Sequence, residues 1–256
     1  MIADLNFQIP ELNLMKKYPK DLRYIGNLNL LNKRKISIVG SRRPLAYTKQ
    51  MTLKLAQELS HRDVCIVSGA AMGVDALAHQ GARSSHTIAV MPTGLSLRYP
   101  SVNANLIKEI EQKGLCISQF EDSQTAKAWS FIQRNELVVA LGESLIVTQA
   151  DKNSGSMRSV AFALEMGKKV YVLPHRIKDS EGTNELLEKN LATCIYDINL
   201  FVEEFGGKSV KNDEFLTYCT SSPSLDEALF RYGNLVYEYE LEGLICIENG
   251  SVRVLL

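Results

Sequence analysis

Short apolar runs alternate with longer segments of helical periodicity along the chain from residue 36 onward. The runs are continuous and rich in β-branched residues, which is typical of strands buried on both faces. We predict strands at 36–39, 64–67, 87–91, 115–117, 145–147 and 169–173. The intervening segments predict helices at 46–61, 74–82, 103–112, 129–141 and 156–167. This alternation predicts an α/β fold with a doubly wound, mostly parallel sheet.

The pattern changes after residue 205, where Gly206-Gly207-Lys208-Ser209 reads as a linker. Three short helical segments then precede two apolar runs joined by Asn249-Gly250, a pair that suits a type I′ hairpin turn. Three helices and a terminal hairpin predict a small winged-helix-like domain. The expected domains are a partly helical lead-in at 1–35, the α/β domain at 36–205, a linker at 206–212 and the winged-helix-like domain at 213–256.

The net charge of zero conceals an asymmetry between the two predicted domains. Residues 210–256 carry three basic and eight acidic groups, a balance of −5, which leaves 26 basic and 21 acidic groups, or +5, in residues 1–209. A polyanion is therefore expected to bind the larger domain. The candidate recognition helix at 234–240 carries no cation, so the smaller domain is expected to contact protein rather than DNA.

Cysteine usage and hydropathy exclude several classes of protein. The five cysteines are widely spaced and form no CxxC pair, so neither a disulfide framework nor a zinc site is predicted, and a reducing cytoplasm fits best. No apolar run approaches the roughly 18 residues of a membrane span. The first residues lack the layout of a secretory signal, so no membrane insertion is expected.

Two loops at the predicted carboxyl edge of the sheet carry the chemistry of an anion site, and such edges bind ligands in doubly wound folds. They consist of Gly40, Ser41, Arg42 and Arg43 in the first loop and Ser154, Gly155 and Ser156 in the second. Each loop precedes a helix, whose first amides and positive dipole end favour a phosphate, and guanidinium groups add charge. The alternative for the first loop is a tight turn with solvated arginines. Neither a GxGxxG fingerprint nor a Walker loop is present.

A third loop, at 68–75, is rich in small residues and leads to His79. Asp75 can cap the following helix, and His79 is a candidate base, although a packed structural role is favoured for both. The sequence contains no G-x-S-x-G elbow and no H-E-x-x-H motif. Binding is therefore a better expectation than catalysis.

The segment 127–135 interleaves cations with aromatic rings. Its members are Lys127, Trp129, Phe131, Arg134 and Asn135. Stacking rings beside cations are the composition of a platform for single-stranded nucleic acid. The alternative, which this segment alone favours, is an ordinary amphipathic helix with Trp129 or Phe131 in the core.

The order and spacing of these short motifs resemble the bacterial DNA-processing protein A family of natural transformation. The matching motifs run from about residue 18 to 205 and include Tyr18-Pro19, Gly40-Ser41-Arg42, Gly73-Val74-Asp75, Ala78-His79, Tyr99-Pro100, Arg134-Asn135, Ser154-Gly155-Ser156 and Gly182-Thr183-Asn184. The resemblance implies an extended Rossmann-like fold that binds single-stranded DNA and forms homodimers. It also implies loading of a RecA-type recombinase onto incoming DNA. No cofactor is predicted.

The resemblance also implies roles for individual residues. Ser41 and Arg42 match the family's phosphate-binding loop, and Lys127 and Phe131 fall where relatives place a cation and a base-stacking aromatic. The chain departs from the family pattern at three positions. Ile132 and His175 replace a usual proline and a usual glycine, and Gln149 lies near a usual glutamate.

Three functions remain open on the sequence alone. The first is a non-enzymatic, cytoplasmic mediator that binds and protects incoming single-stranded DNA, with double-stranded DNA as an open second ligand. The second is a nucleotide-processing enzyme similar to the phosphoribohydrolases, although Pro92-Thr93-Gly94-Leu95 lacks the second glycine and the acid of their motif. The third is a sensor in which Gly40–Arg42 holds a nucleotide phosphate. The motif order and the segment 127–135 favour the first.

Overall fold

The computed structural model describes residues 2–206, 214–241 and 243–255. The chain divides into two compact units, Met1–Gly206 and Gly207–Leu256, and each is described here by itself. Except for Gly206, the predicted linker at 206–212 lies outside the described residues. Among the described residues, no helix combines the length and the apolar character that crossing a membrane requires.

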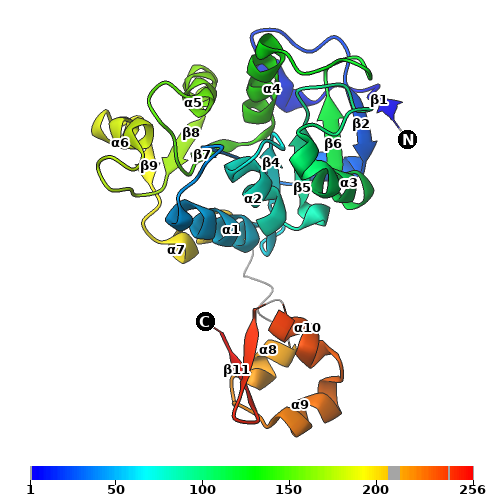
Figure 1. The fold of residues 1–256 in the computed structure, drawn as a ribbon, viewed down its shortest axis with the longest axis vertical. Coiled ribbons are helices and arrows are strands. Elements are labelled where there is room, and N and C mark those ends of the chain that lie inside the picture. Colours follow the sequence, from blue (N-terminus) through cyan, green and yellow to red (C-terminus); the bar gives the residue numbers. More distant parts are fainter. Residues whose placement is uncertain (1, 207–213, 242, 256) are drawn as a thin grey trace. The chain divides into compact units, whose positions relative to one another are not determined.

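The first unit is built on a nine-stranded sheet with the order β1-β2-β6-β5-β4-β3-β7-β8-β9 (Figure 1). The strands are β1 (Ala3–Asp4), β2 (Arg23–Gly26), β3 (Lys35–Val39), β4 (Cys65–Ser68), β5 (Thr87–Val90), β6 (Leu115–Ser118), β7 (Ser144–Val147), β8 (Lys169–Val172) and β9 (Thr193–Cys194). Strands β3 to β9 pair in parallel, whereas β1 and β2 are antiparallel to their neighbours. The predicted doubly wound, mostly parallel sheet is confirmed.

Helices cover both faces of this sheet, as Figure 1 shows. They are α1 (Ala46–Ser60), α2 (Val74–Gly81), α3 (Ala104–Lys113), α4 (Ala128–Leu141), α5 (Gly155–Glu165), α6 (Glu181–Glu188) and α7 (Ile198–Glu203). Successive strand residues point to opposite faces, so Ile36 and Ile38 of β3 join a core with α1, α2 and α7. Val39 joins the other core, with α4 and α5.

The N-terminal residues belong to the sheet and its core, which the sequence did not predict. The strands β1 and β2 extend the sheet beyond β6. Two 3-10 helices, η1 (Pro10–Leu14) and η2 (Leu28–Asn32), bury Leu12 and Leu30 in the core shared with α4. Two shorter 3-10 helices are η3 (Ser84–His86) and η4 (Ser101–Asn103).

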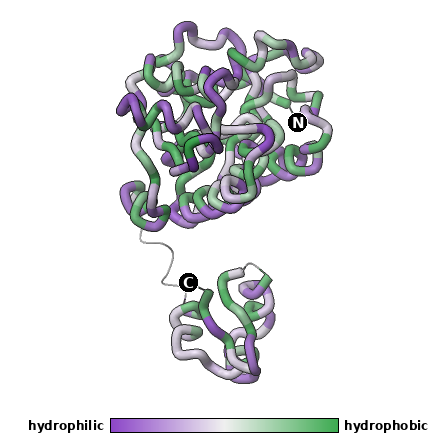
Figure 2. Tube along the Cα trace, turned by 60° about the vertical axis from the view of Figure 1, so that its left-hand side comes forward, coloured by the Kyte–Doolittle hydropathy of each residue, from purple (hydrophilic) through white to green (hydrophobic). Residues whose placement is uncertain are grey.

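Within residues 214–241 and 243–255, the second unit has three helices and a hairpin, as predicted: α8 (Glu214–Cys219), α9 (Leu225–Tyr232), α10 (Leu235–Leu241), β10 (Ile245–Glu248) and β11 (Ser251–Val254). Asn249 and Gly250 both have positive φ, at 51° and 77°, as a type I′ turn requires. Phe215, Val236 and Val252 lie in a core of its own. Figure 2 shows apolar stretches of the trace in both units, with hydrophilic stretches on outer loops.

Candidate nucleic-acid interface

The loops after β3 and β7 meet at the carboxyl edge of the sheet, where the chain changes direction across it. The amide of Ser41 donates to the carbonyl of Gln149 at 2.8 Å, and the amide of Thr148 donates to the carbonyl of Val39 at 3.2 Å. A crevice at such a switch point is the usual ligand position in doubly wound folds. The predicted phosphate loop therefore lies where a ligand is expected.

Glycine at position 40 lets this loop pack against the start of α2. A Cβ on Gly40 would lie 2.7 Å from Cγ2 of Val74, closer than real Cβ contacts come. The amide of Val74 in turn donates to the carbonyl of Ser41 at 3.1 Å. Contacts with α2 thus fix the loop, and the side chains of Arg42 and Arg43 remain exposed to solvent.

The amides of the loop before α1 are engaged by the protein, whereas the expectation that the first amides of α1 bind an anion stays a prediction. The amide of Leu45 donates to Oε1 of Gln149 at 2.9 Å, and the amide of Arg43 donates to Oγ of Ser41 at 3.1 Å. The amide of Ser41 is engaged as well. These three amides therefore stabilise the loop and are not available to bind an anion. The Arg42 guanidinium is therefore the main anion-binding group that this loop presents.

Phe131 lies beneath Arg42 and is half-buried rather than part of the core. The Arg42 Cζ atom is 5.3 Å from the centre of the Phe131 ring, within range of a cation–π contact. The Tyr99 ring lies beside it, with centroids 6.0 Å apart. The expectation of a core aromatic is wrong for Phe131 and also for Trp129, which is 46% exposed.

A small, shallow hollow opens between these side chains. It is lined by Arg42, Gly69, Ala71, Met72, Pro92, Tyr99, Pro100, Phe131 and Arg134. A wider groove continues from it past Tyr99 and Phe131 to Lys127, which is exposed at the start of α4. The structure thus brings Arg42, Phe131 and Lys127 to one surface, with mostly apolar walls between cations.

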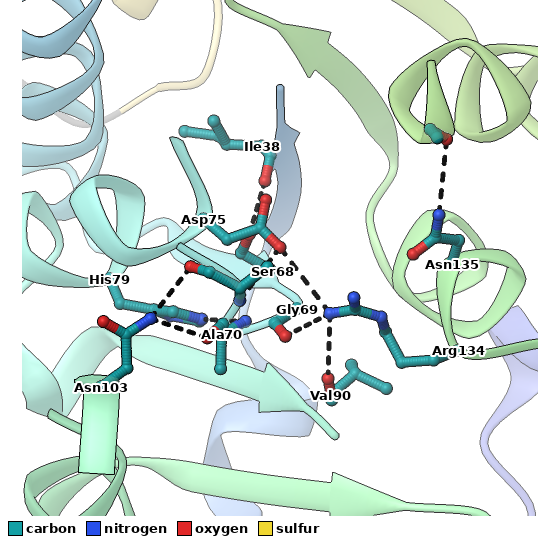
Figure 3. A network of polar contacts seen from close by, with 12 residues as sticks. Ile38, Ser68, Gly69, Ala70, Asp75, His79, Val90, Asn103, Arg134 and Asn135 are labelled. Carbon is teal, nitrogen blue, oxygen red and sulfur yellow. Dashed lines mark hydrogen bonds and ion pairs between the residues drawn. The ribbon is translucent and has the colours of Figure 1, made fainter. Parts of the chain in front are cut away.

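Arg134 has a different place from the one predicted (Figure 3). It is 3% exposed, and its Nη1 donates to the carbonyl of Gly69, lies 3.5 Å from that of Val90 and lies 3.7 Å from Oδ2 of Asp75. Burial lowers the pKa of Arg134 and raises that of Asp75, and their mutual attraction opposes both shifts. Arg134 therefore ties α4 to the ends of β4 and β5, and it meets the hollow only as part of its wall.

Asn135 and the second predicted anion loop join helices rather than face the hollow. Nδ2 of Asn135 donates to the carbonyl of Gly155 at 3.4 Å and so links α4 to the first residue of α5 (Figure 3). Ser154 is the N-cap of α5, with its Oγ accepting from the amide of Met157 at 3.4 Å, and Ser156 is buried. These side chains therefore make structural contacts, and their role as ligand contacts stays a prediction.

His79 is wholly buried and has partners on both ring nitrogens. Nε2 accepts from the amide of Ala70 at 3.2 Å, and Nδ1 lies 2.6 Å from Oγ1 of Thr87. Because that hydroxyl donates to the carbonyl of Ile66 at 2.8 Å, the hydrogen between His79 and Thr87 belongs to Nδ1. Burial, followed by the charge of Arg134, lowers the pKa of His79 to about 3. A neutral, fully engaged imidazole braces the loop and cannot serve as a base.

Sequence comparison places the first unit among known proteins. The family model for DNA recombination-mediator protein A matches residues 4–206. DNA processing protein DprA of Bacillus subtilis is 32% identical over 194 residues, covering 74% of this chain and 65% of that protein. Protein Smf of Escherichia coli is 33% identical over 192 residues, covering 73% and 51%. The chain thus matches less than two thirds of the length of these relatives.

Solved structures of DNA processing proteins are also similar to this chain. DNA processing protein A from Helicobacter pylori, whose structure concerns a single-stranded DNA binding mode, is similar with a TM-score of 0.79 and 40% identity, covering 80% of this chain and 95% of that one. The Streptococcus pneumoniae DNA processing protein A has a TM-score of 0.74 and 30% identity, covering 81% and 75%.

Proposed function

The chain belongs to the DNA recombination-mediator protein A family, and on this premise we propose that it binds single-stranded DNA at the carboxyl edge of its sheet. The observation that carries the proposal is the Arg42 guanidinium above the Phe131 ring at the mouth of the hollow. The H. pylori protein, which binds single-stranded DNA, is 40% identical and adds support. Duplex DNA is a weaker candidate, because stacked, paired bases offer no free face to this ring.

The geometry suits one nucleotide unit of a strand. A base stacks on Phe131 at the mouth of the hollow, where Tyr99 and Met72 supply apolar walls. Arg42 then meets a neighbouring phosphate, and Lys127, at the far end of the groove, meets another. Stacking on a ring and contact with phosphates discriminate little between base sequences, as a mediator of general recombination requires.

We extend the proposal to the cellular role. A strand held in this way is protected, and the bound protein loads a RecA-type recombinase onto incoming DNA during natural transformation in the cytoplasm, acting as a homodimer. Support for this extension comes from membership of the family alone.

The other two functions fit the site less well. A nucleotide-processing enzyme needs a base or nucleophile at the hollow, and the candidates Asp75 and His79 are buried and engaged. A nucleotide sensor would use the same hollow and the same Arg42. Competition by mononucleotides, with analysis of any product, separates it from the strand-binding proposal.

The test is the variant Arg42→Ala, measured with a labelled single-stranded oligonucleotide. A charge-assisted contact contributes roughly 1.5–3 kcal/mol, so we expect affinity to fall about tenfold to a hundredfold. The melting temperature should not change, because Arg42 is exposed. Arg43→Ala, at the adjacent exposed position, is the matched control and should lose less. Affinity of Arg42→Ala within about twofold of wild type would remove Arg42 from the site.

A further inference from the structure

The loop that joins β8 to α6, residues 173–180, is anchored beside the loop that carries Arg42. Nε2 of His175 donates to the carbonyl of Thr148 at 2.6 Å, directly after β7. The His175 ring also packs edge-on against Tyr47 in the first turn of α1, with centroids 5.6 Å apart at 90°. The β8–α6 loop is therefore part of the same carboxyl edge, separated from Arg42 only by the β7 loop.

The backbone of this loop is held by protein contacts. Nδ2 of Asn184, from α6, donates to the carbonyls of Arg176 and Ile177 at 3.0 and 3.2 Å. At the end of the loop, Oγ of Ser180 accepts from the amide of Ala150 at 2.9 Å. A fixed backbone loses little conformational freedom when a ligand binds to its side chains.

The side chains at the tip of the loop point away from the protein. Ile177 is 86% exposed, and both Arg176 and Lys178 are exposed. Within residues 2–206, 214–241 and 243–255, neither cation makes an ion pair or a side-chain hydrogen bond. A rigid loop that presents an aliphatic side chain between two unpaired cations suits a polyanion with apolar faces.

We propose that the β8–α6 loop is a second contact for the same DNA strand, on the opposite side of Arg42 from Lys127. The inference rests on the proposed function and extends it from one nucleotide pocket to a path along the sheet edge. The strand order places this path: the hollow lies at the ends of β4 and β5, Arg42 follows β3, and the loop follows β8. Arg176 and Lys178 meet phosphates, and Ile177 contacts a base or sugar between them.

The test compares oligonucleotides of two lengths. Single-strand sites cover about 4 to 16 nucleotides, so we choose one oligonucleotide of about 4 and one of about 16. The variant Arg176→Ala/Lys178→Ala should bind the longer one about tenfold more weakly at low salt. Two lost phosphate contacts should flatten its log affinity–log salt slope by about 1.4. Its affinity for the shorter one should stay within about twofold, because the pocket at Arg42 is intact.

A matched control removes two exposed cations from the opposite edge of the sheet. Lys113 ends α3 just before β6, and Lys169 opens β8, so Lys113→Ala/Lys169→Ala removes the same charge at the amino ends of the strands. This control should bind both oligonucleotides as wild type does. Ile177→Ala should weaken binding of the longer oligonucleotide about threefold, equally at low and high salt.

Equal loss from the loop variant and the control would overturn the inference, because only net charge would then matter. Unchanged affinity of the loop variants for the longer oligonucleotide would also overturn it. If such variants instead alter self-association, the loop belongs to an interface between copies. Failure of the proposed function is a separate result, since Arg42→Ala would then leave both lengths unaffected.

Discussion

Polar side chains buried near the hollow, His79 above all, are engaged by neighbouring protein groups. The imidazole is sandwiched between the amide of Ala70 and the hydroxyl of Thr87, and both bonds need the Nδ1-protonated neutral ring. Asn103 braces the same loop by donating to the carbonyls of Ala70 and Ala71 at 2.9 and 3.1 Å (Figure 3). A rigid small-residue loop below the hollow is the consequence.

We predict that His79 stays neutral down to the acid limit of the folded state. Its folded pKa of about 3 lies below the unfolded value of about 6.5, so below pH 6.5 only the unfolded chain gains the proton. Stability is therefore lost as pH falls from about 6.5 toward about 3, by up to about 1.4 kcal/mol per pH unit from this group. Comparing urea unfolding of wild type and His79→Gln over this range isolates the effect, because the variant should show a flatter profile.

Nuclear magnetic resonance of the ring nitrogens checks the same point directly. Nδ1 should show the shift of a protonated nitrogen and Nε2 that of an acceptor from about pH 8 to about pH 5. A titration midpoint near 6.5 would contradict the buried, engaged ring and reopen its role as a base.

Single residues also show where sequence reasoning succeeds. Arg42 was predictable because a cation directly after a buried strand and before a helix has no core to enter. Arg134 was not, because its environment comes from three distant carbonyl and carboxyl groups, on Gly69, Val90 and Asp75, which only the fold brings together. A sequence in which cations alternate with aromatic rings does not show which side chains face a ligand and which pack between a helix and the sheet.

At the scale of elements, α4 carries both a residue that fastens it to the sheet and residues expected to bind DNA. Its inner side carries Arg134, which fastens it to the strand ends, and its first turns carry Phe131 beside the hollow. Lys127 is the N-cap of the helix, and its backbone amide donates to Oγ of Ser130 at 3.0 Å. The fastening by Arg134 keeps the ring and the cation in register with Arg42.

We predict different signatures for the two binding residues of α4. Phe131→Ala should lose about 1–3 kcal/mol of oligonucleotide binding, and this loss should persist at high salt because stacking releases no counterions. Lys127→Ala should instead flatten the log–log salt dependence by about 0.7, the value for one phosphate contact on a single strand. Affinity at two salt concentrations, together with melting temperature, distinguishes them. If Phe131→Ala melts much earlier while the folded variant binds normally, the ring is a core residue.

Elements with strong periodicity were predictable, whereas weakly patterned strands and the contacts that hold helix ends were not. The strands β1 and β2 are short and only partly buried, and β1 forms the edge of the sheet, so no apolar run marks them. The end of α4 is held by Lys168, whose Nζ donates to the carbonyls of Val139 and Ala140 at 2.8 and 2.6 Å. A lysine so distant from the helix end gives no local capping signal.

At the scale of the whole molecule, the net charge is positive in the first compact unit and negative in the second. The sequence balance is +5 for residues 1–209 and −5 for 210–256. The helix α10, Leu235–Leu241, has the sequence LVYEYEL and brings no cation to a phosphate. Phosphate neutralisation provides most nonspecific DNA affinity, so the smaller unit is poorly suited to that task despite its winged-helix-like fold.

The most direct measurement is the affinity for a labelled single-stranded oligonucleotide of the full chain and of a chain truncated after Gly206, where the first compact unit ends. We predict that both bind, with affinities within about twofold and parallel salt slopes, because Arg42, Phe131 and Lys127 all lie in the first unit. The melting of the truncated chain supplies the folding control. Absence of binding by the full chain, or a large loss on truncation with the fold intact, would contradict a DNA site at this sheet edge.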